Sequence, residues 1–479
     1  MHFLLTLAVV AALVIAENVP GEPVLGVGNR LILAVVGIVL VPLVAAFLSI
    51  GTARQLRRHP ACQSALLRQF RRLRKLHAAV WLTTAIGILC AADWPQIVRF
   101  NWRLEGTFLL DDILILLPVL LPLVLSWAAF YEVDREARSG PFGDAALGTV
   151  PLGPRSAVAP GGAAAAALSR GAYVTVHVRH YLGLLLVPVL LLLAVQDAMR
   201  LWLPRFREGA AVAVCGGTVL LLVIFFPVLL RYVWQTQPLP AGPLRDRLQR
   251  AARRAGLHVR EILVWHTGGL VVNAAVAGMV PGLRYVFLSD GLLEHLSDDE
   301  IQAVFGHEIG HIRHGHLFLR GLALLAPLSL WLLLDQAIPQ FGDRVQTGLI
   351  SGGPLLQAHA AMLGLAVMFL YMLAIFGPFC RLLEGQADLY GCRTLAREPS
   401  AQPVQTFVSA LESLAVLCGT DRRAGNWQHA SIARRVHFLK RVAREPARES
   451  LFLGRLRLIK GLLVAMALGP LVYRVLWLG

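Results

Sequence analysis

Apolar residues in this chain gather into long unbroken runs instead of the short alternating patterns of a soluble domain. A helix needs about 20 apolar residues to cross the roughly 30 Å hydrocarbon core of a bilayer. Runs of that order lie at 3–20, 31–50, 77–93, 108–131, 181–203, 210–232, 317–338, 355–378 and 459–477. The sequence therefore predicts an α-helical multi-pass membrane protein with about nine spans.

Two polar stretches between the runs, 233–316 and 379–458, carry patterns typical of a folded domain. Leu244 to Ala255 spaces its apolar residues as an amphipathic helix does. Three short segments bounded by Gly and Pro predict strands, at 261–265, 273–277 and 284–288. We therefore expect the two stretches to form one mainly α domain that carries a small β-sheet.

The chain divides into seven segments on this basis. They are N-terminal spans with a basic loop, a flexible cytoplasmic linker, a membrane hairpin, the first half of the polar domain, a second hairpin, its second half and a last span, at 1–132, 133–180, 181–232, 233–316, 317–378, 379–458 and 459–479. The linker is predicted because Ser139 to Ala172 is rich in Gly, Pro and Ala. Met1-His2 provides no basic region of a signal peptide, so an uncleaved first helix is favoured over a cleaved leader.

Composition and charge support a membrane protein and predict its orientation. Hydrophobic residues make up 56% of the chain and charged residues 15%, with a mean hydropathy of +0.63. The net charge of +16 is unevenly placed. Eight basic residues without an acid crowd one loop, namely Arg54, Arg57, Arg58, Arg68, Arg71, Arg72, Arg74 and Lys75. By the positive-inside rule that loop is cytoplasmic, and alternation places 233–316 and 379–458 there too. The charge is thus explained by orientation and anionic lipid, and we expect no nucleic-acid partner.

His307-Glu308-Ile309-Gly310-His311 predicts a zinc site. A capping box at Ser297 begins the helix, which places the two imidazoles on one face and Glu308 beside a metal-bound water. A catalytic zinc usually takes a third protein ligand, and Glu384 is the best candidate. Asp388 follows one helical turn later and can receive the free N–H of a ligating histidine. We predict one Zn²⁺ per chain, held by His307, His311 and Glu384.

The acidic residues at 384 and 388 and the histidines at 314 and 316 have other interpretations. Glu384 and Asp388 could lie on a solvated helix face that offsets basic neighbours. His314 and His316 could be further ligands, but they precede a long apolar run, where a membrane interface is the favoured interpretation.

Taken together, the motifs resemble the membrane zinc metallopeptidases of the CaaX prenyl protease and heat-shock HtpX type. The similarity covers roughly residues 235–445. Its elements follow in order as Asn273-Ala274 with Gly278, Ser289 to Leu293, His307 to His311, His314-Gly315-His316, Glu384 to Asp388, and His429 to Val436.

The resemblance implies an endopeptidase with Glu308 as general base. In that family a substrate strand pairs along the segment that corresponds here to Asn273, Ala274, Ala275 and Gly278. His429-Ala430-Ser431 is similar to a late His-Pro-Ser segment, with Ala430 in place of proline. His429 or Arg435 could supply a donor to the tetrahedral oxyanion.

The expected function is hydrolysis of peptide bonds at the cytoplasmic side of a bacterial inner membrane. Its substrates would be membrane-associated peptides or proteins, in quality control or processing. Alternatives are a receptor-like signalling metalloprotease with one dedicated partner and a non-catalytic metal-binding scaffold. An intramembrane protease is disfavoured because the motif helix carries Asp298, Asp299, Glu300 and Arg313 and is too polar for hydrocarbon.

Overall fold

Two units, each with its own core, make up the chain. The computed structural model describes residues 2–18, 25–139, 168–202, 208–338, 345, 347–348, 364, 367–396, 402–418, 421–425 and 429–477. The first unit comprises Met1–Gln237 with Trp265–Val271. The second comprises Pro238–Val264 with Val272–Gly479 and contains every predicted site residue.

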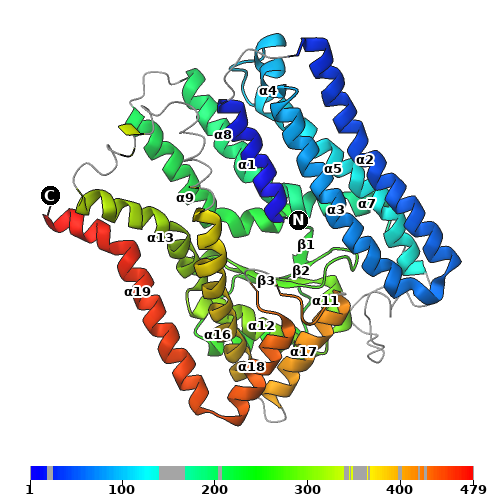
Figure 1. Cartoon of the computed structure of the whole chain (residues 1–479). Coiled ribbons are helices and arrows are strands. Elements are labelled where there is room, and N and C mark those ends of the chain that lie inside the picture. The colour runs from blue at the N-terminus through cyan, green and yellow to red at the C-terminus, as the bar shows by residue number, and fades with distance from the viewer. Residues whose placement is uncertain are drawn as a thin grey trace. The chain divides into compact units, whose positions relative to one another are not determined.

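The first unit is built from helices. They are α1 (His2–Asn18), α2 (Val27–Arg58), the 3₁₀-helix η1 (Pro60–Cys62), α3 (Gln63–Cys90), α4 (Trp94–Gln96), the π-helix η2 (Ile97–Asn101), α5 (Leu110–Ser139), α7 (Arg170–His177), the π-helix η3 (Val178–Gly183), α8 (Leu184–Trp202) and α9 (Glu208–Val233). The helices α2, α3 and α5 pack side by side (Figure 1). Their shared core contains the buried rings of Trp81 and Trp127.

A buried cation lies within this helical unit. Arg30, 2% exposed, donates to Asp93 at 3.2 Å, to Gln96 at 3.1 Å and to Asn101 at 3.3 Å. A charge on an apolar helix is costly unless it is paired, and these contacts supply the pairing. They also tie the start of α2 to the segment that follows α3.

Among the described residues, six helices are long and apolar enough to cross a membrane. They are Val27–Arg58, Ala65–Cys90, Leu110–Ala137, Arg170–Trp202, Gly209–Val233 and Val367–Leu395. The predicted runs 3–20, 317–338 and 459–477 are not in this set, and α1 is 17 residues long. A multi-pass helical architecture is therefore supported, whereas the count of nine spans is not confirmed.

Helices occupy both ends of the predicted linker 133–180. The helix α5 runs on to Ser139, and Ser169 caps α7 by accepting a hydrogen bond from the Ala172 amide at 3.1 Å. The helix α7 continues through η3 into α8. Residues 133–139 and 170–180 of the predicted linker are therefore helical. Its remaining part, 140–167, lies outside the described residues.

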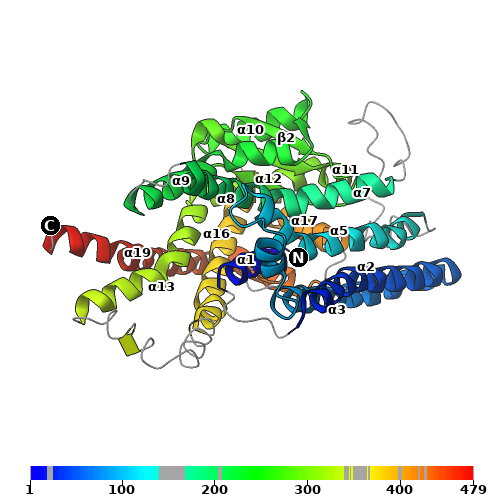
Figure 2. The same ribbon diagram turned by 90° about the horizontal axis from the view of Figure 1, so that it is seen from above.

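The second unit combines a small sheet with a group of helices. Its elements are β1 (Thr236–Pro238, at the boundary of the units), α10 (Pro243–Arg254), β2 (Glu261–Trp265), β3 (Ala274–Ala277), the 3₁₀-helix η4 (Pro281–Leu283), β4 (Tyr285–Ser289), α11 (Asp290–His295), α12 (Asp298–Arg313), α13 (His316–Ala337), the π-helix η5 (Met372–Phe376), α16 (Gly377–Leu395), α17 (Pro403–Leu417), α18 (Ile432–Arg444) and α19 (Ala447–Trp477). Figure 2 shows the same helices from above. The three predicted strands and the amphipathic helix are confirmed, while β1 was missed.

The sheet has the order β1-β2-β4-β3, which leaves β3 at an edge. β3 pairs antiparallel with β4, with Ala274 opposite Leu288 and Ala277 opposite Tyr285. Ile301, Phe305 and Ile309 of α12 share a buried core with the sheet and α10. Burying each such side chain contributes about 1.5–3 kcal/mol, which holds the predicted zinc helix against the sheet.

The contact between α12 and α16 depends on glycine. A Cβ on Gly306 would lie 2.3 Å from Oγ1 of Thr394, and one on Gly310 would lie 3.2 Å from Cα of Ala387. The helices can approach this closely because neither glycine has a side chain. This approach brings the His307–His311 segment next to Glu384 and Asp388.

The predicted capping box fixes the start of α12. Ser297 Oγ accepts from the Glu300 amide at 3.2 Å, and Glu300 Oε2 accepts from the Ser297 amide at 2.9 Å. The other carboxylate oxygen, Oε1, accepts from Ser409 at 2.7 Å and from Ser413 at 3.2 Å. One glutamate therefore both caps α12 and links it to α17.

Candidate active site and metal centre

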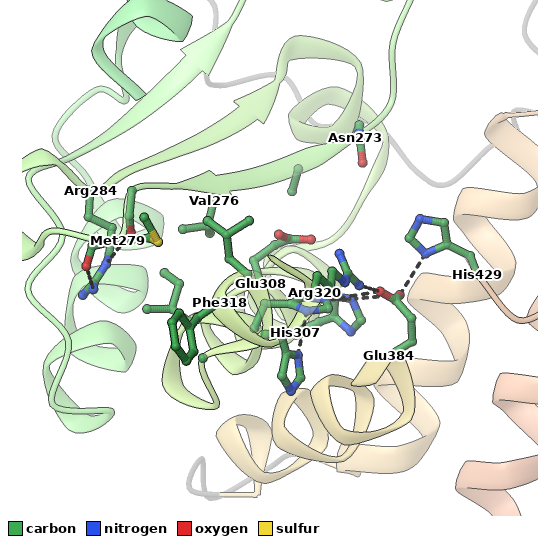
Figure 3. Close-up of a pocket in the computed structure, with 17 residues that line it drawn as sticks. Asn273, Val276, Met279, Arg284, His307, Glu308, Phe318, Arg320, Glu384 and His429 are labelled. Carbon is green, nitrogen blue, oxygen red and sulfur yellow. Dashed lines mark hydrogen bonds and ion pairs between the residues drawn. The ribbon is translucent and has the colours of Figure 1, made fainter. Parts of the chain in front are cut away.

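Three side chains predicted as zinc ligands converge on one point. Nε2 of His307 and Nε2 of His311 lie 3.1 Å apart. Oε2 of Glu384 lies 3.7 Å from the first nitrogen, and Oε1 lies 3.5 Å from the second. The three ligand atoms all lie within 4.8 Å of one another. Figure 3 shows His307 and Glu384 turned toward each other.

A buried ion pair supports His307 from behind. Nδ1 of His307 lies 2.8 Å from Oδ1 of Asp388, which is fully buried. Arg435 on α18 donates to both oxygens of Asp388, from Nε at 2.8 Å and from Nη2 at 2.5 Å. Burial lowers the pKa of His307, but Asp388 outweighs it and leaves that pKa above its ordinary value. A carboxylate accepts and cannot donate, so the proton of neutral His307 belongs on Nδ1 and Nε2 carries a lone pair.

Behind His311 lies another histidine. Nδ1 of His311 is 2.8 Å from Nδ1 of His316, which is 1% exposed. Burial, followed by the charge of His307, lowers the pKa of His311, so this ring is neutral near pH 7. The interfacial interpretation of His316 stays a prediction, and what the structure shows is that its ring is buried against His311, directly after the left-handed turn at Gly315.

The donor set fits a divalent metal such as zinc. The two Nε2 atoms face each other at 3.1 Å beside a carboxylate. Lone pairs so close repel one another unless a cation lies between them. Two imidazole nitrogens and one carboxylate oxygen form a ligand set that zinc commonly takes in catalytic sites.

Glu308 lies next to this group at a cavity of about 510 Å³. Its carboxylate is hydrogen-bonded to the backbone of Val276 on β3, and burial raises the pKa of this carboxyl group above its ordinary value. Figure 3 shows Glu308 beside Val276, with Phe318 and Met279 at one end of the cavity and His429 at the other. The cavity therefore joins the candidate metal ligands to the free edge of the sheet.

The other predicted site residues divide into two groups. Asn273, Ala274, Gly278 and His429 line the cavity, and Nδ1 of His429 lies 3.1 Å from Oε2 of Glu384. Ala275 is not among the lining residues.

Arg435 is not among the lining residues either, and its guanidinium donates to both oxygens of Asp388. The contact that the structure shows for Arg435 is with Asp388, and its role as an oxyanion donor stays a prediction.

Sequence reasoning missed Arg320. It lines the cavity and donates from Nη2 to Oε1 of Glu384 at 2.7 Å (Figure 3). A signal was present, because Arg320 is a charged residue inside the apolar run 317–338, and such residues commonly have a functional role.

Comparison with known proteins decides which family this geometry resembles. Residues 238–443 match the model described as Peptidase family M48. The resemblance inferred from the motifs is thereby confirmed. The segment contains His307, His311, Glu308, Glu384 and Asp388.

Bacterial relatives support the same assignment. The chain is 29% identical over 174 residues to "Protease HtpX" of Xylella fastidiosa, which covers 36% of this chain and 57% of that protein. It is 27% identical over 175 residues to "Protease HtpX" of Yersinia enterocolitica, covering 35% and 59%. The matches therefore span less than two thirds of these relatives' length.

A solved structure extends the likeness to the fold. The crystal structure of S. mikatae Ste24p aligns with a TM-score of 0.51 at 17% sequence identity, over 88% of this chain and 100% of that one. The membrane helices and the peptidase segment thus share an architecture with Ste24p.

Proposed function

We propose that this chain is a zinc-dependent integral-membrane endopeptidase that cleaves proteins at the cytoplasmic side of the membrane. The observation that carries the proposal is the convergence of two imidazole nitrogens and one carboxylate beside Glu308, in a cavity next to the edge strand β3. The M48 match over the same residues supports it.

His307, His311 and Glu384 would hold one Zn²⁺. When bound there, zinc polarises the scissile carbonyl and lowers the pKa of a bound water toward about 7. Glu308 accepts the proton of the attacking water and returns it to the leaving amine. Its raised pKa suits this exchange, because a carboxyl group with a pKa closer to neutrality takes up a proton more readily.

The free edge of β3 would bind the substrate main chain. Asn273 faces β4, since its carbonyl accepts from the Ser289 amide at 3.0 Å. Alternate residues of a strand direct their main-chain groups to opposite sides. The main-chain groups of Ala274 and Val276 therefore face away from β4, in agreement with the contact between Val276 and Glu308. A substrate strand added here passes directly over the catalytic group.

Arg320 and His429 are the basic side chains best placed to stabilise the oxyanion. Both line the cavity and contact Glu384, one from each side of its carboxylate. His429 is half exposed, so it is accessible from the cavity. Of the two oxyanion donors that the sequence suggested, we keep His429, and we propose Arg320 in place of Arg435.

The orientation and location follow the charge distribution. The cluster of basic residues between Arg54 and Lys75 supports an inner-membrane protein whose active site faces the bacterial cytoplasm. To test this, cysteines replace Ala65 and Arg250 in a chain whose native cysteines are serines. Both should be shielded from an impermeant thiol reagent in intact cells, and labelling of position 250 alone would refute the orientation.

The catalytic proposal is tested with matched carboxylate variants of the full chain in detergent. Glu308→Gln should abolish cleavage of an unfolded protein and leave zinc bound, because Glu308 is a base and not a ligand. Glu384→Ala should lose both zinc and cleavage. Glu445→Gln, on an exposed turn, serves as the control. Near-normal turnover of Glu308→Gln would overturn the mechanism, and a parent that binds zinc without cleaving would indicate a scaffold.

A further inference from the structure

His311 is supported by a chain of side chains from three helices. Behind it, Nε2 of His316 on α13 lies 3.0 Å from Oε1 of Gln386 on α16. Lys460 on α19 donates to the same oxygen at 2.6 Å. We propose that His316 is a positioning residue that fixes the tautomer and ring plane of His311, with its own tautomer set by Gln386 and Lys460. The inference rests on the metal site proposed above and adds three residues to it.

The direction of each hydrogen bond follows from Lys460. An ammonium group has N–H donors and no acceptor, so the Gln386 atom that it contacts is the amide oxygen. That oxygen has a second lone pair and accepts the Nε2–H of His316. Because a neutral imidazole has one N–H, Nδ1 of His316 then carries a lone pair and accepts the Nδ1–H of His311. His311 is left with a lone pair on Nε2, the atom that faces His307 and Glu384.

The geometry shows why this support is specific. The rings of His311 and His316 meet edge to face, with centroids 4.9 Å apart and planes at 78°. His316 is 1% exposed, so water does not replace it readily as an acceptor. Without it, the Nδ1–H of His311 loses its partner and the ring can adopt the other tautomer, in which Nε2 carries the proton. A protonated Nε2 does not bind a metal.

Two substitutions separate hydrogen bonding from shape. His316→Phe keeps a ring but removes the acceptor. His316→Asn places Oδ1 about where Nδ1 of histidine lies, and so keeps an acceptor for His311. Zinc dissociation constants are measured by competition with a chromogenic chelator on the full chain in detergent, and Co²⁺ absorption spectra report the ligand geometry. His316→Phe should weaken zinc binding about 10–100-fold and alter the cobalt bands, while His316→Asn should retain most of the affinity.

Thermal unfolding of the chelator-treated chain controls for a purely structural role. Equal midpoints for the Phe and Asn variants, together with unequal zinc affinities, are the expected result. An affinity of His316→Phe equal to that of the parent would overturn the proposal, as would equal losses in both variants. If Glu384→Ala binds zinc as tightly as the parent, the metal site itself is refuted, and the positioning role with it. If Glu384→Ala loses zinc affinity but His316→Phe keeps it, the metal site stands and only the positioning role is refuted.

Discussion

The two imidazoles of the metal centre reach the same tautomer by different means. His307 contacts a carboxylate, Asp388, whose charge Arg435 balances. His311 contacts a neutral imidazole, followed by an amide and a terminal ammonium. The first support acts through charge and makes its histidine more basic, whereas the second acts through the direction of hydrogen bonds. The comparison shows that orienting a ligand does not require a negative charge beside it.

Removing the charged support should have the largest effect. Asp388→Ala deletes the acceptor of His307 and leaves Arg435 buried without its partner. We expect zinc affinity to fall about 10–100-fold and the free energy of unfolding to fall by about 3–5 kcal/mol. Zinc titration and chemical denaturation of the same preparation measure the two effects.

A second substitution separates these two losses. In Asp388→Ala/Arg435→Met the unpaired charge is gone, so part of the stability should return while zinc affinity stays low. A double variant no more stable than Asp388→Ala would mean that Arg435 is tolerated alone, and that its pairing is not what stabilises this side.

Disturbing the contact shared by both supports should have an intermediate effect. Gly306→Ala introduces a Cβ 2.3 Å from Oγ1 of Thr394, which forces α12 away from α16. Overpacking of this kind costs about 1–3 kcal/mol in the free energy of unfolding, which denaturation measures. Zinc affinity should fall as well, because Gln386 and Asp388 both lie on α16 and move together. The added substitution Thr394→Ala should restore part of the stability, and no recovery would place the strain elsewhere.

Removing Lys460, the last residue of the hydrogen-bonded series behind His311, should have the smallest effect on zinc affinity. Lys460→Met removes the ammonium that fixes the Gln386 amide, at a cost of about 0.5–1.5 kcal/mol for the hydrogen bond, so zinc affinity should fall by less than about tenfold. Lys440→Met, on an exposed position of α18, is the matched control. If Lys460→Met lost as much zinc affinity as Asp388→Ala, the proposed difference between the two supports would be refuted.

Local patterns sufficed to predict much of the second unit. Alternation and bounding turns predicted β2, β3 and β4, and the Ser297 capping box predicted the start of α12. These signals act between residues a few positions apart. The number of spans is different, because six helices among the described residues are long and apolar enough to cross, and the runs 3–20, 317–338 and 459–477 are not among them.

The pairs His307 with His311 and Glu384 with Asp388 were predicted because spacing on one helix determines which side chains share a face. Contacts across helices carry no such spacing. His316 and Gln386 are 70 residues apart, and Asp388 and Arg435 are 47 apart. The apolar run after His316 predicts a membrane boundary, and that local pattern does not reveal that the ring of His316 contacts His311.

The short length of β3 limits which features of a substrate the proposed enzyme can recognise. The strand covers Ala274–Ala277, about 13 Å at 3.3 Å per residue, and Gly278, with φ of +118°, turns the chain away. A Cβ there would lie 2.5 Å from the Leu283 carbonyl oxygen, which keeps the turn tight. Main-chain hydrogen bonds along so short an edge are blind to side-chain identity, yet they require a segment whose own backbone groups are unpaired. Such an edge discriminates folded chains from unfolded ones more sharply than it discriminates one sequence from another.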